Sequence, residues 1–366
     1  MDDASTALAD RFVSAGLATM ELFAVHLGLR HGLYRALNDL GRANPRALAA
    51  AANIHPRYAR EWLEQQAVAG MLECVRIAED PYASTYALPV AHVPVLLDED
   101  SPYFLAPMAR FMAGIAGTLP ALESAFRTGE GVPYGAYGAD TREAIAGLNR
   151  PMYRGELAKD WLTALPDVHA RLTAGAGRVL DLGCGEGWSS IALAEAFPAI
   201  RVDGVDLDEP SLVQARRQAM RAGVADRVTF TTADAASAGG AGGAGSAGTG
   251  PYDLICVFEA LHDMADPVAT LRTARTLLAG GGAVLIADEK VAESFVAPGD
   301  DVERLNYAYS VLHCLPATRA EGATEEAGTV LRPGTVRRYA ERAGFERFEV
   351  LPVAHEQWRF YRLGAR

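Results

Sequence analysis

The sequence predicts an α/β fold for the C-terminal part of the chain and a mostly helical domain before it. Three observations support this. An acidic glycine turn, Asp181–Gly187, lies between a short apolar strand pattern and a helical pattern, which is the order of a βα unit. The apolar runs that follow end in acidic residues, as the strands of a parallel sheet often do. Upstream of residue 130, apolar residues recur at helical spacing instead.

The glycine turn is the first candidate binding element. Gly183, Gly185 and Gly187 lack a Cβ and can adopt backbone angles that other residues avoid. Their backbone can therefore approach a nucleotide-like ligand closely. The structural alternative is a tight βα connection without a ligand, which the strands that follow make less favourable.

Three apolar runs after the turn predict further strands. Val202–Asp208 ends in acidic residues about 25 residues after Asp181. At this position a carboxylate can accept hydrogen bonds from both hydroxyls of a ribose. Val228–Ala235 also ends near an acid. Tyr252–Glu259 is almost continuously apolar, which predicts a buried parallel strand, and it leads directly into His262.

Together these motifs resemble the class I S-adenosylmethionine (SAM)-dependent methyltransferases. The glycine turn looks like their SAM motif and not like a dinucleotide fingerprint, because its glycines alternate and an acid precedes them. The resemblance implies SAM as the cofactor and a seven-stranded Rossmann-like methyltransferase sheet. It also implies that the residues at the tips of these strands bind SAM: Asp181, Gly183, Gly185, Gly187, Asp206, Leu207, Asp234, Ala235 and Phe258.

The resemblance gives each part of this set a role. The glycines approach the methionine and ribose portions, and Asp181 orients the turn or meets the amino group. Asp206 holds the ribose hydroxyls, while Leu207 covers the adenine. Asp234 accepts from the adenine amino group with Ala235 beside it, and Phe258 lies near the sulfonium or the ring.

The length of 366 residues favours two domains. Thr128–Gly135 is rich in turn residues and marks the division. Upstream of it, two helical patterns begin at Asn44 and Pro56, and Met71–Leu88 predicts two short strands, which together form a winged-helix pattern. The expected domains are a winged-helix-like dimerisation and substrate-capping domain over 1–130, linking helices lining the acceptor pocket over 131–165, and the SAM-binding domain over 166–366.

Two further motifs resemble the small-molecule O-methyltransferases that carry a winged-helix dimerisation domain, among them plant phenylpropanoid, hydroxyindole and bacterial antibiotic-tailoring enzymes. Leu261–Asp266 is similar to a His-Asp-Trp-x-Asp segment in which the His is the general base. Leu148–Met152 is similar to a Phe-Asn-x-x-Met segment whose Met lines the acceptor pocket. The resemblance implies a homodimer and methyl transfer to a small, largely apolar acceptor, at oxygen.

His262 is the predicted catalytic base. An imidazole titrates near neutrality, so it can take the proton of an acceptor hydroxyl without being permanently charged. It follows the fourth strand, at the sheet edge where open α/β folds bind ligands. The structural alternative is a histidine that only packs or hydrogen-bonds at the start of a helix.

The family places acids beside its base. Asp288 and Glu289 follow the predicted strand Ala283–Ala287, and Glu289 is taken as the catalytic partner. The second family acid has no counterpart in Val330–Pro333. This departure leaves N- or C-methylation on the same scaffold open as an alternative.

Three residues are the candidates for acceptor binding: Met152, Tyr309 and His313. Methionine and aromatic side chains at helical spacing are more often core residues than pocket residues. Their abundance nevertheless favours a flat, apolar acceptor, and His313 is a second candidate base.

The net charge of −12 argues against a polyanion-binding surface and predicts no nucleic-acid partner. Winged helices often bind DNA, so a SAM-binding or DNA-binding regulator without catalysis is the alternative from another class. The candidate recognition helix carries Arg57 and Arg60, but Glu61 and Glu64 follow on the next turn. A helix in the major groove needs surplus positive charge.

The remaining features predict a cytoplasmic protein. The N-terminus lacks a basic-then-apolar signal, and no apolar run is expected to approach the length of a membrane span. No His/Asp/Glu cluster has metal-ligand spacing, so no metal is predicted. Ser237–Gly250 is expected to be a flexible, glycine-rich surface insertion.

Overall fold

The computed structural model describes residues 3–238 and 250–364. Most of the glycine-rich insertion expected at Ser237–Gly250 lies outside the described residues. The chain forms two compact units. The first comprises Met1–Ala116 and Glu143–Pro151, and the second comprises Gly117–Arg142 and Met152–Arg366.

The first unit is helical with a small antiparallel hairpin, as the winged-helix pattern predicts. Asn44 begins α3 because its side chain accepts a hydrogen bond from the backbone N–H of Ala47 at 2.9 Å. Strand β1 pairs with β2 to form the wing. Leu37, Leu48 and Leu63 are fully buried in the core of this unit. Its elements are α1 (Asp3–Arg30), α2 (Leu33–Leu40), α3 (Pro45–Ala52), α4 (Pro56–Val68), β1 (Glu73–Arg76), β2 (Thr85–Ala87) and α5 (Val93–Leu96).

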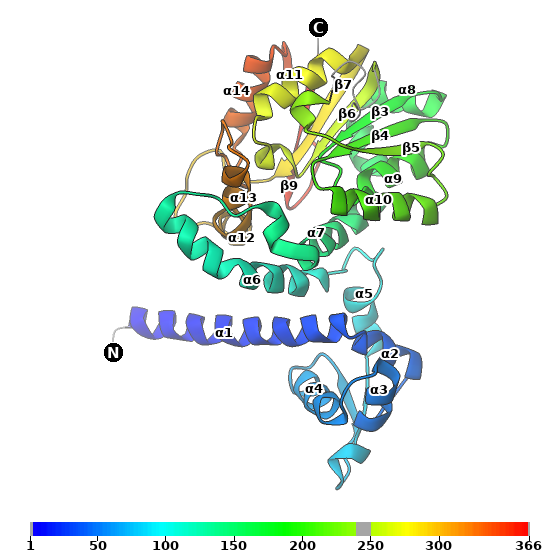
Figure 1. Ribbon diagram of the computed structural model, residues 1–366, viewed down its shortest axis with the longest axis vertical. Coiled ribbons are helices and arrows are strands. Elements are labelled where there is room, and N and C mark those ends of the chain that lie inside the picture. The colour runs from blue at the N-terminus through cyan, green and yellow to red at the C-terminus, as the bar shows by residue number, and fades with distance from the viewer. Residues whose placement is uncertain (1–2, 239–249, 365–366) are drawn as a thin grey trace. The chain divides into compact units, whose positions relative to one another are not determined.

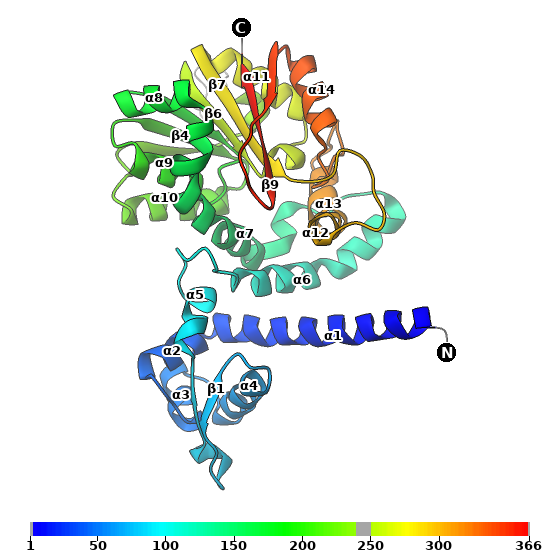
Figure 2. The ribbon, with the colours of Figure 1, turned by 180° about the vertical axis from the view of Figure 1, so that it is seen from behind.

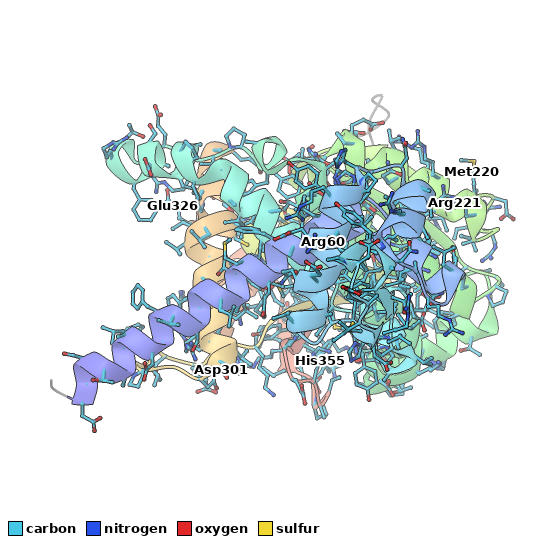
Figure 3. The ribbon with its side chains drawn as sticks, turned by 90° about the horizontal axis from the view of Figure 1, so that it is seen from below. Arg60, Met220, Arg221, Asp301, Glu326 and His355 are labelled. Carbon is cyan, nitrogen blue, oxygen red and sulfur yellow. The ribbon has the colours of Figure 1, made fainter. Side chains whose placement is uncertain are left out.

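Helix α1 ends at Arg30, and α2 begins at Leu33 after a short turn. Helix α1 is long and apolar enough, by length and composition, to cross a membrane, so the expectation that no run approaches that length was wrong. Figure 3 draws α1 as one continuous helix with its side chains.

The second unit contains a seven-stranded sheet in the order β5-β4-β3-β6-β7-β9-β8. The first five strands in this order, β5, β4, β3, β6 and β7, pair in parallel with their neighbours. Strand β9 is antiparallel to both of its neighbours, β7 and β8. The predicted seven-stranded α/β sheet is therefore confirmed. The strands are β3 (Arg178–Leu182), β4 (Arg201–Asp206), β5 (Val228–Thr232), β6 (Tyr252–Phe258), β7 (Leu278–Glu289), β8 (Arg347–Val350) and β9 (Trp358–Gly364).

Helices cover both faces of this sheet. In Figures 1 and 2, α8, α9 and α10 lie on one face, and α11 and α14 lie on the other. Each face has its own hydrophobic core, because alternate residues such as Val179 and Leu180 point to opposite sides of β3. These helices are α8 (Pro166–Ala174), α9 (Trp188–Ala196), α10 (Glu209–Arg221), α11 (Pro267–Leu277) and α14 (Pro333–Ala343).

A second group of helices in this unit lies outside the strand–helix alternation. Figure 3 shows it between the labelled Asp301, which begins α12, and Glu326, which follows α13. Two stretches are π-helical, a conformation often found at functional sites. The group consists of α12 (Asp301–Tyr309), a π-helical turn (Ser310–Cys314) and α13 (Leu315–Ala320), and the other π-helical stretch is Tyr153–Trp161. Helices α6 (Pro107–Thr128) and α7 (Gly138–Met152) contribute residues to both units.

Candidate active site

The glycine turn lies at the carboxyl edge of the sheet between β3 and α9. Gly183, Gly185 and Gly187 have φ values of 75°, 51° and 81°, which L side chains rarely adopt. A Cβ on Gly183 would lie 2.6 Å from the Cβ of Ala260, two residues before His262. The turn and the segment that carries His262 are therefore in direct contact.

Two aspartates hold this turn in place. The carboxylate of Asp181 accepts hydrogen bonds from the hydroxyls of Ser189 and Ser190, each at 2.6 Å, and so ties β3 to the first turn of α9. Burial raises the pKa of Asp181 to about 6. Asp206, at the tip of β4, accepts from the backbone N–H of Gly185 at 2.8 Å and from that of Asp208 at 2.9 Å.

The remaining predicted cofactor residues lie at the same edge. Leu207 keeps 53% of its surface exposed beside Asp206, although it is apolar. Asp234 is exposed and begins a short 3-10 turn, while Ala235 and Phe258 are buried. A Cβ on Gly185 would meet nothing within 4 Å, so there is open space above the turn. The adenosine part of SAM fits these three features, which are the open glycine turn, the exposed apolar side chain of Leu207 and the carboxylate of Asp206 between them.

His262 lies in a short 3-10 turn after β6 and keeps only 2% of its surface exposed. Its Nδ1 is 2.9 Å from Oδ1 of Asp288 and 3.1 Å from Oε2 of Glu289. Its Nε2 is 3.4 Å from Oδ1 of Asp263. Both acids predicted beside the base therefore contact the same ring nitrogen. They are the last two residues of β7 and do not follow the strand.

The charges of this group are interdependent. Burial alone would lower the pKa of His262, but the carboxylates of Asp263, Glu289 and Asp288 raise it well above its ordinary value. Burial raises the pKa of Glu289 well above its usual range. Burial also disfavours the charged form of Asp288, yet the adjacent His262 holds its pKa below the ordinary value. The ionised form is therefore favoured at Asp288 and the neutral form at Glu289, on the same side of the imidazole.

The three predicted acceptor residues belong to the second unit. His313 is 2% exposed, and its ring meets those of Tyr137 and Tyr134 edge-on, with centroids 4.5 and 5.7 Å away. Burial lowers the pKa of His313, which disfavours the charged form of its imidazole. Tyr309 ends α12, and burial followed by the charge of Glu259 raises the pKa of its hydroxyl. Met152 packs against the core of the sheet's α9 face.

Sequence reasoning missed four residues near this edge. Arg142 donates to both carboxylate oxygens of Asp208 at 2.6 and 2.7 Å, and its guanidinium lies 5.6 Å from the ring centroid of Tyr134. Tyr137 donates from its hydroxyl to the carbonyl of Leu312 at 2.8 Å. The turn-rich stretch Thr128–Gly135, which contains Tyr134, indicated only a domain boundary.

The fourth missed residue is Glu259, which has a φ of 48° directly after β6. A left-handed backbone is unusual for a residue with a Cβ and often occurs at functional sites. Asp208, by contrast, caps the start of α10, where its carboxylate accepts a hydrogen bond from the backbone N–H of Ser211 at 2.9 Å.

Residues 174–341 match the profile of a methyltransferase domain family, and residues 16–97 match that of the Rv2258c-like winged HTH domain. Residues 174–341 therefore form a SAM-dependent methyltransferase domain. SAM is the cofactor of such a domain. The methyltransferase also carries the winged helix at its N-terminal side, as the sequence motifs predicted.

Solved structures share this two-part fold over their whole length. The mitomycin 7-O-methyltransferase MmcR is 21% identical, with a TM-score of 0.68 and a coverage of 99% of both chains. Human N-acetylserotonin methyltransferase is 17% identical, with a TM-score of 0.70 and coverages of 100% of this chain and 98% of the human one. At these identities the likeness concerns the fold alone.

A curated relative matches over a shorter segment. The 27-O-demethylrifamycin SV methyltransferase of Amycolatopsis mediterranei is 31% identical over 128 residues, which is 35% of this chain and 44% of the relative. The matched part thus spans less than half of that relative.

Proposed function

We propose that this methyltransferase transfers the methyl group of SAM to the oxygen of a small, largely apolar acceptor, with His262 as general base. The supporting observation is the position of His262. It follows β6 at the carboxyl edge of the sheet, in contact with the glycine turn through Ala260, and two carboxyl groups hold its Nδ1. Three acids around one buried imidazole shift its pKa strongly, which is typical of functional sites.

SAM supplies an electrophilic methyl group on a sulfonium centre. The protein must place the acceptor oxygen in line with that methyl and remove its proton. In this proposal Asp288 fixes the tautomer of His262 by accepting from Nδ1. Nε2 takes the acceptor proton in the neutral form of the ring, which becomes more abundant as pH rises toward the raised pKa of His262. Glu289 supports the same orientation, and Tyr309, His313 and Met152 line the acceptor side.

The direct test replaces the base. His262→Ala should bind SAM with nearly unchanged affinity in calorimetry, while methyl transfer to the acceptor falls by about 10²- to 10⁴-fold, the usual contribution of a general base. His169→Ala, in which another histidine of the same unit is removed, is the matched control and should keep full turnover. Acceptors with phenol, amine and carbon-acid groups, offered with labelled SAM, identify the atom that is methylated.

Equal turnover in His262→Ala and wild type, with the acceptor that the panel identifies, removes His262 from the mechanism. Methylation of amines alone would replace O-methylation by N-methylation. SAM binding without transfer to any acceptor, together with a salt-sensitive shift of duplex DNA, would favour the regulator alternative.

We further propose that the protein is a cytoplasmic homodimer that buries α1 against a second copy of the chain. Every residue of α1 from Asp3 to Met20 is exposed. Phe12 and Val13 each keep 72% of their surface exposed, and Met20 keeps 69%. An apolar patch of this length is unusual for a surface that stays in water and typically marks an interface.

The oligomeric state tests this second proposal. Wild type should sediment as a dimer, and the double substitution Phe12→Asp with Leu17→Asp should give a monomer. Ile77→Asp is the control, because Ile77 is 85% exposed but lies in the wing. A monomeric wild type, or a protein that α1 carries onto lipid vesicles, contradicts the proposal.

A further inference from the structure

Three different metal-ligating groups meet on the Nε2 side of His262. A nitrogen of His262, a carboxylate oxygen of Asp263 and the sulfur of Cys314 all lie within 4.8 Å of one another. Nε2 of His262 is the nitrogen that faces Asp263, at 3.4 Å. Cys314 comes from the π-helical turn after α12, more than fifty residues along the chain from the other two.

This donor set differs from the acidic group on the other side of the ring. Nitrogen, thiolate sulfur and carboxylate oxygen are together the ligands that Zn²⁺ and related soft divalent ions select. In a tetrahedral site such atoms stand about 3.3 to 3.6 Å apart, given metal–ligand bonds of about 2.0 to 2.3 Å. The present spacing allows that geometry after side-chain movements of about 1 Å.

Two independent observations support a ligand at this point. Oδ1 of Asp263 is buried and has no hydrogen-bond partner within the described residues. On the far side of the ring, Nδ1 of His262 is hydrogen-bonded to the carboxylate of Asp288 at 2.9 Å. Metal-binding histidines typically have this carboxylate–histidine–metal arrangement, which orients the ring and raises its basicity.

We propose that His262, Asp263 and Cys314 form an inhibitory site for Zn²⁺ or a similar thiophilic divalent ion. The inference rests on the proposed function, because the ion would occupy the lone pair of Nε2 that takes the acceptor proton. Binding forms three coordinate bonds, releases the thiol proton of Cys314 and the Nε2 proton of His262 to solvent, and leaves the fourth position to water. In this proposal the bound ion takes no part in methyl transfer and inhibits it.

The site can be tested without turnover. Co²⁺ added to the full-length protein with S-adenosylhomocysteine should give a sulfur-to-cobalt charge-transfer band at one equivalent. Cys314→Ser should lose the band, and Cys74→Ser, which removes the exposed thiol, should keep it. Asp263→Asn provides a second variant and should weaken Co²⁺ binding by about 10-fold or more, since even outer-shell changes cost 10- to 100-fold. No band, or a band that survives in Cys314→Ser, overturns the proposal.

Activity then shows whether the site inhibits. Zn²⁺ should stop methyl transfer by wild type and by Cys74→Ser, and a chelator should restore it. Cys314→Ser should retain activity and require about 10-fold more Zn²⁺ for the same inhibition. Equal sensitivity of Cys314→Ser and wild type contradicts the proposal. A cobalt band together with full activity of His262→Ala would instead keep the metal site and remove the assigned base.

Discussion

The cofactor side and the acceptor side of the second unit are built by different means. On the cofactor side, Gly183, Gly185 and Asp206 form a backbone structure from two neighbouring βα turns. On the acceptor side, His313 is held by Tyr134 and Tyr137, which lie about 175 residues away in the chain. The comparison shows that local backbone geometry positions the proposed cofactor residues, whereas long-range packing positions the proposed acceptor residues. Substitutions on the two sides should therefore separate SAM affinity from acceptor kinetics.

The largest effect is expected at Gly183. A methyl side chain there adds strain at φ 75° and meets the Cβ of Ala260 at 2.6 Å. Gly183→Ala should lower the free energy of unfolding by about 4 kcal/mol, the sum of backbone strain and overpacking. Denaturant unfolding of the SAM-free protein measures it.

Gly185→Ala is the matched comparison, because its φ is also positive but nothing lies within 4 Å of the added Cβ. It should cost only about 1 kcal/mol of stability. SAM affinity in calorimetry should nevertheless fall by about 10-fold or more, because the methyl enters the space assigned to the cofactor. Normal SAM binding by Gly185→Ala would show that the cofactor does not lie on this turn.

The second largest effect concerns the charge of Asp181. Its pKa is about 6 in the folded protein, against 3.8 ordinarily, because the side chain is buried. Below both values the carboxyl is neutral in both states. As pH rises from about 4 to 6 the unfolded chain ionises first, so the folded state loses about 3 kcal/mol of stability, and the loss persists at higher pH.

Asp181→Asn cannot ionise and should escape this loss. Its advantage in unfolding free energy over wild type should therefore approach about 3 kcal/mol near pH 8 and vanish near pH 4. Unfolding of both proteins across this pH range measures the difference. A constant difference at all pH values would mean that the serine hydrogen bonds, and not the charge, control this position.

The sequence predicted the sheet edge well for a physical reason. Glycines in a βα turn and acids at strand tips act through the local backbone, so their spacing carries the information. The winged helix was predictable in the same way, since Asn44 and Pro45 begin α3 where capping rules place a helix start. The length and exposure of α1 were not predictable. An apolar stripe at helical spacing has the same sequence pattern whether residues of its own chain or of another copy cover it.

The surroundings of the base were only partly predictable. Asp288 and Glu289 were recognised as candidates, but alternation along a strand would send them to opposite faces. Both reach Nδ1 because they end β7, beside the turn that carries His262. The stretch that lacks the second acid, Val330–Pro333, contains Arg332, whose guanidinium pairs with Glu303 of α12 at 3.3 Å. Such a pairing depends on tertiary packing and leaves no local signal.

On the acceptor side, Gly131 should have the next largest effect. A Cβ there would lie 2.1 Å from the backbone nitrogen of Ala320, because the segment before Tyr134 packs directly on α13. Gly131→Ala should cost about 2 kcal/mol by overpacking. The KM for the acceptor should rise by about 10-fold, equal to 1.4 kcal/mol, while SAM affinity stays unchanged. Gly135→Ala is the control, since its Cβ meets only Arg142 at 3.8 Å. Loss of SAM affinity in Gly131→Ala would break the separation of the two sides.

The smallest effect is expected from one hydroxyl. Tyr137→Phe keeps the ring that contacts His313 but removes the hydrogen bond to the carbonyl of Leu312, made at 2.8 Å. That bond should contribute about 1 kcal/mol, so the KM for the acceptor should rise about 5-fold with kcat and SAM affinity unchanged. Tyr252→Phe removes a comparable hydroxyl, which donates to Asp203 at 2.9 Å at the start of β6, far from the carboxyl edge. Because both variants lose one buried hydrogen bond, equal kinetics in the two would mean that Tyr137 stabilises the fold without shaping the acceptor side.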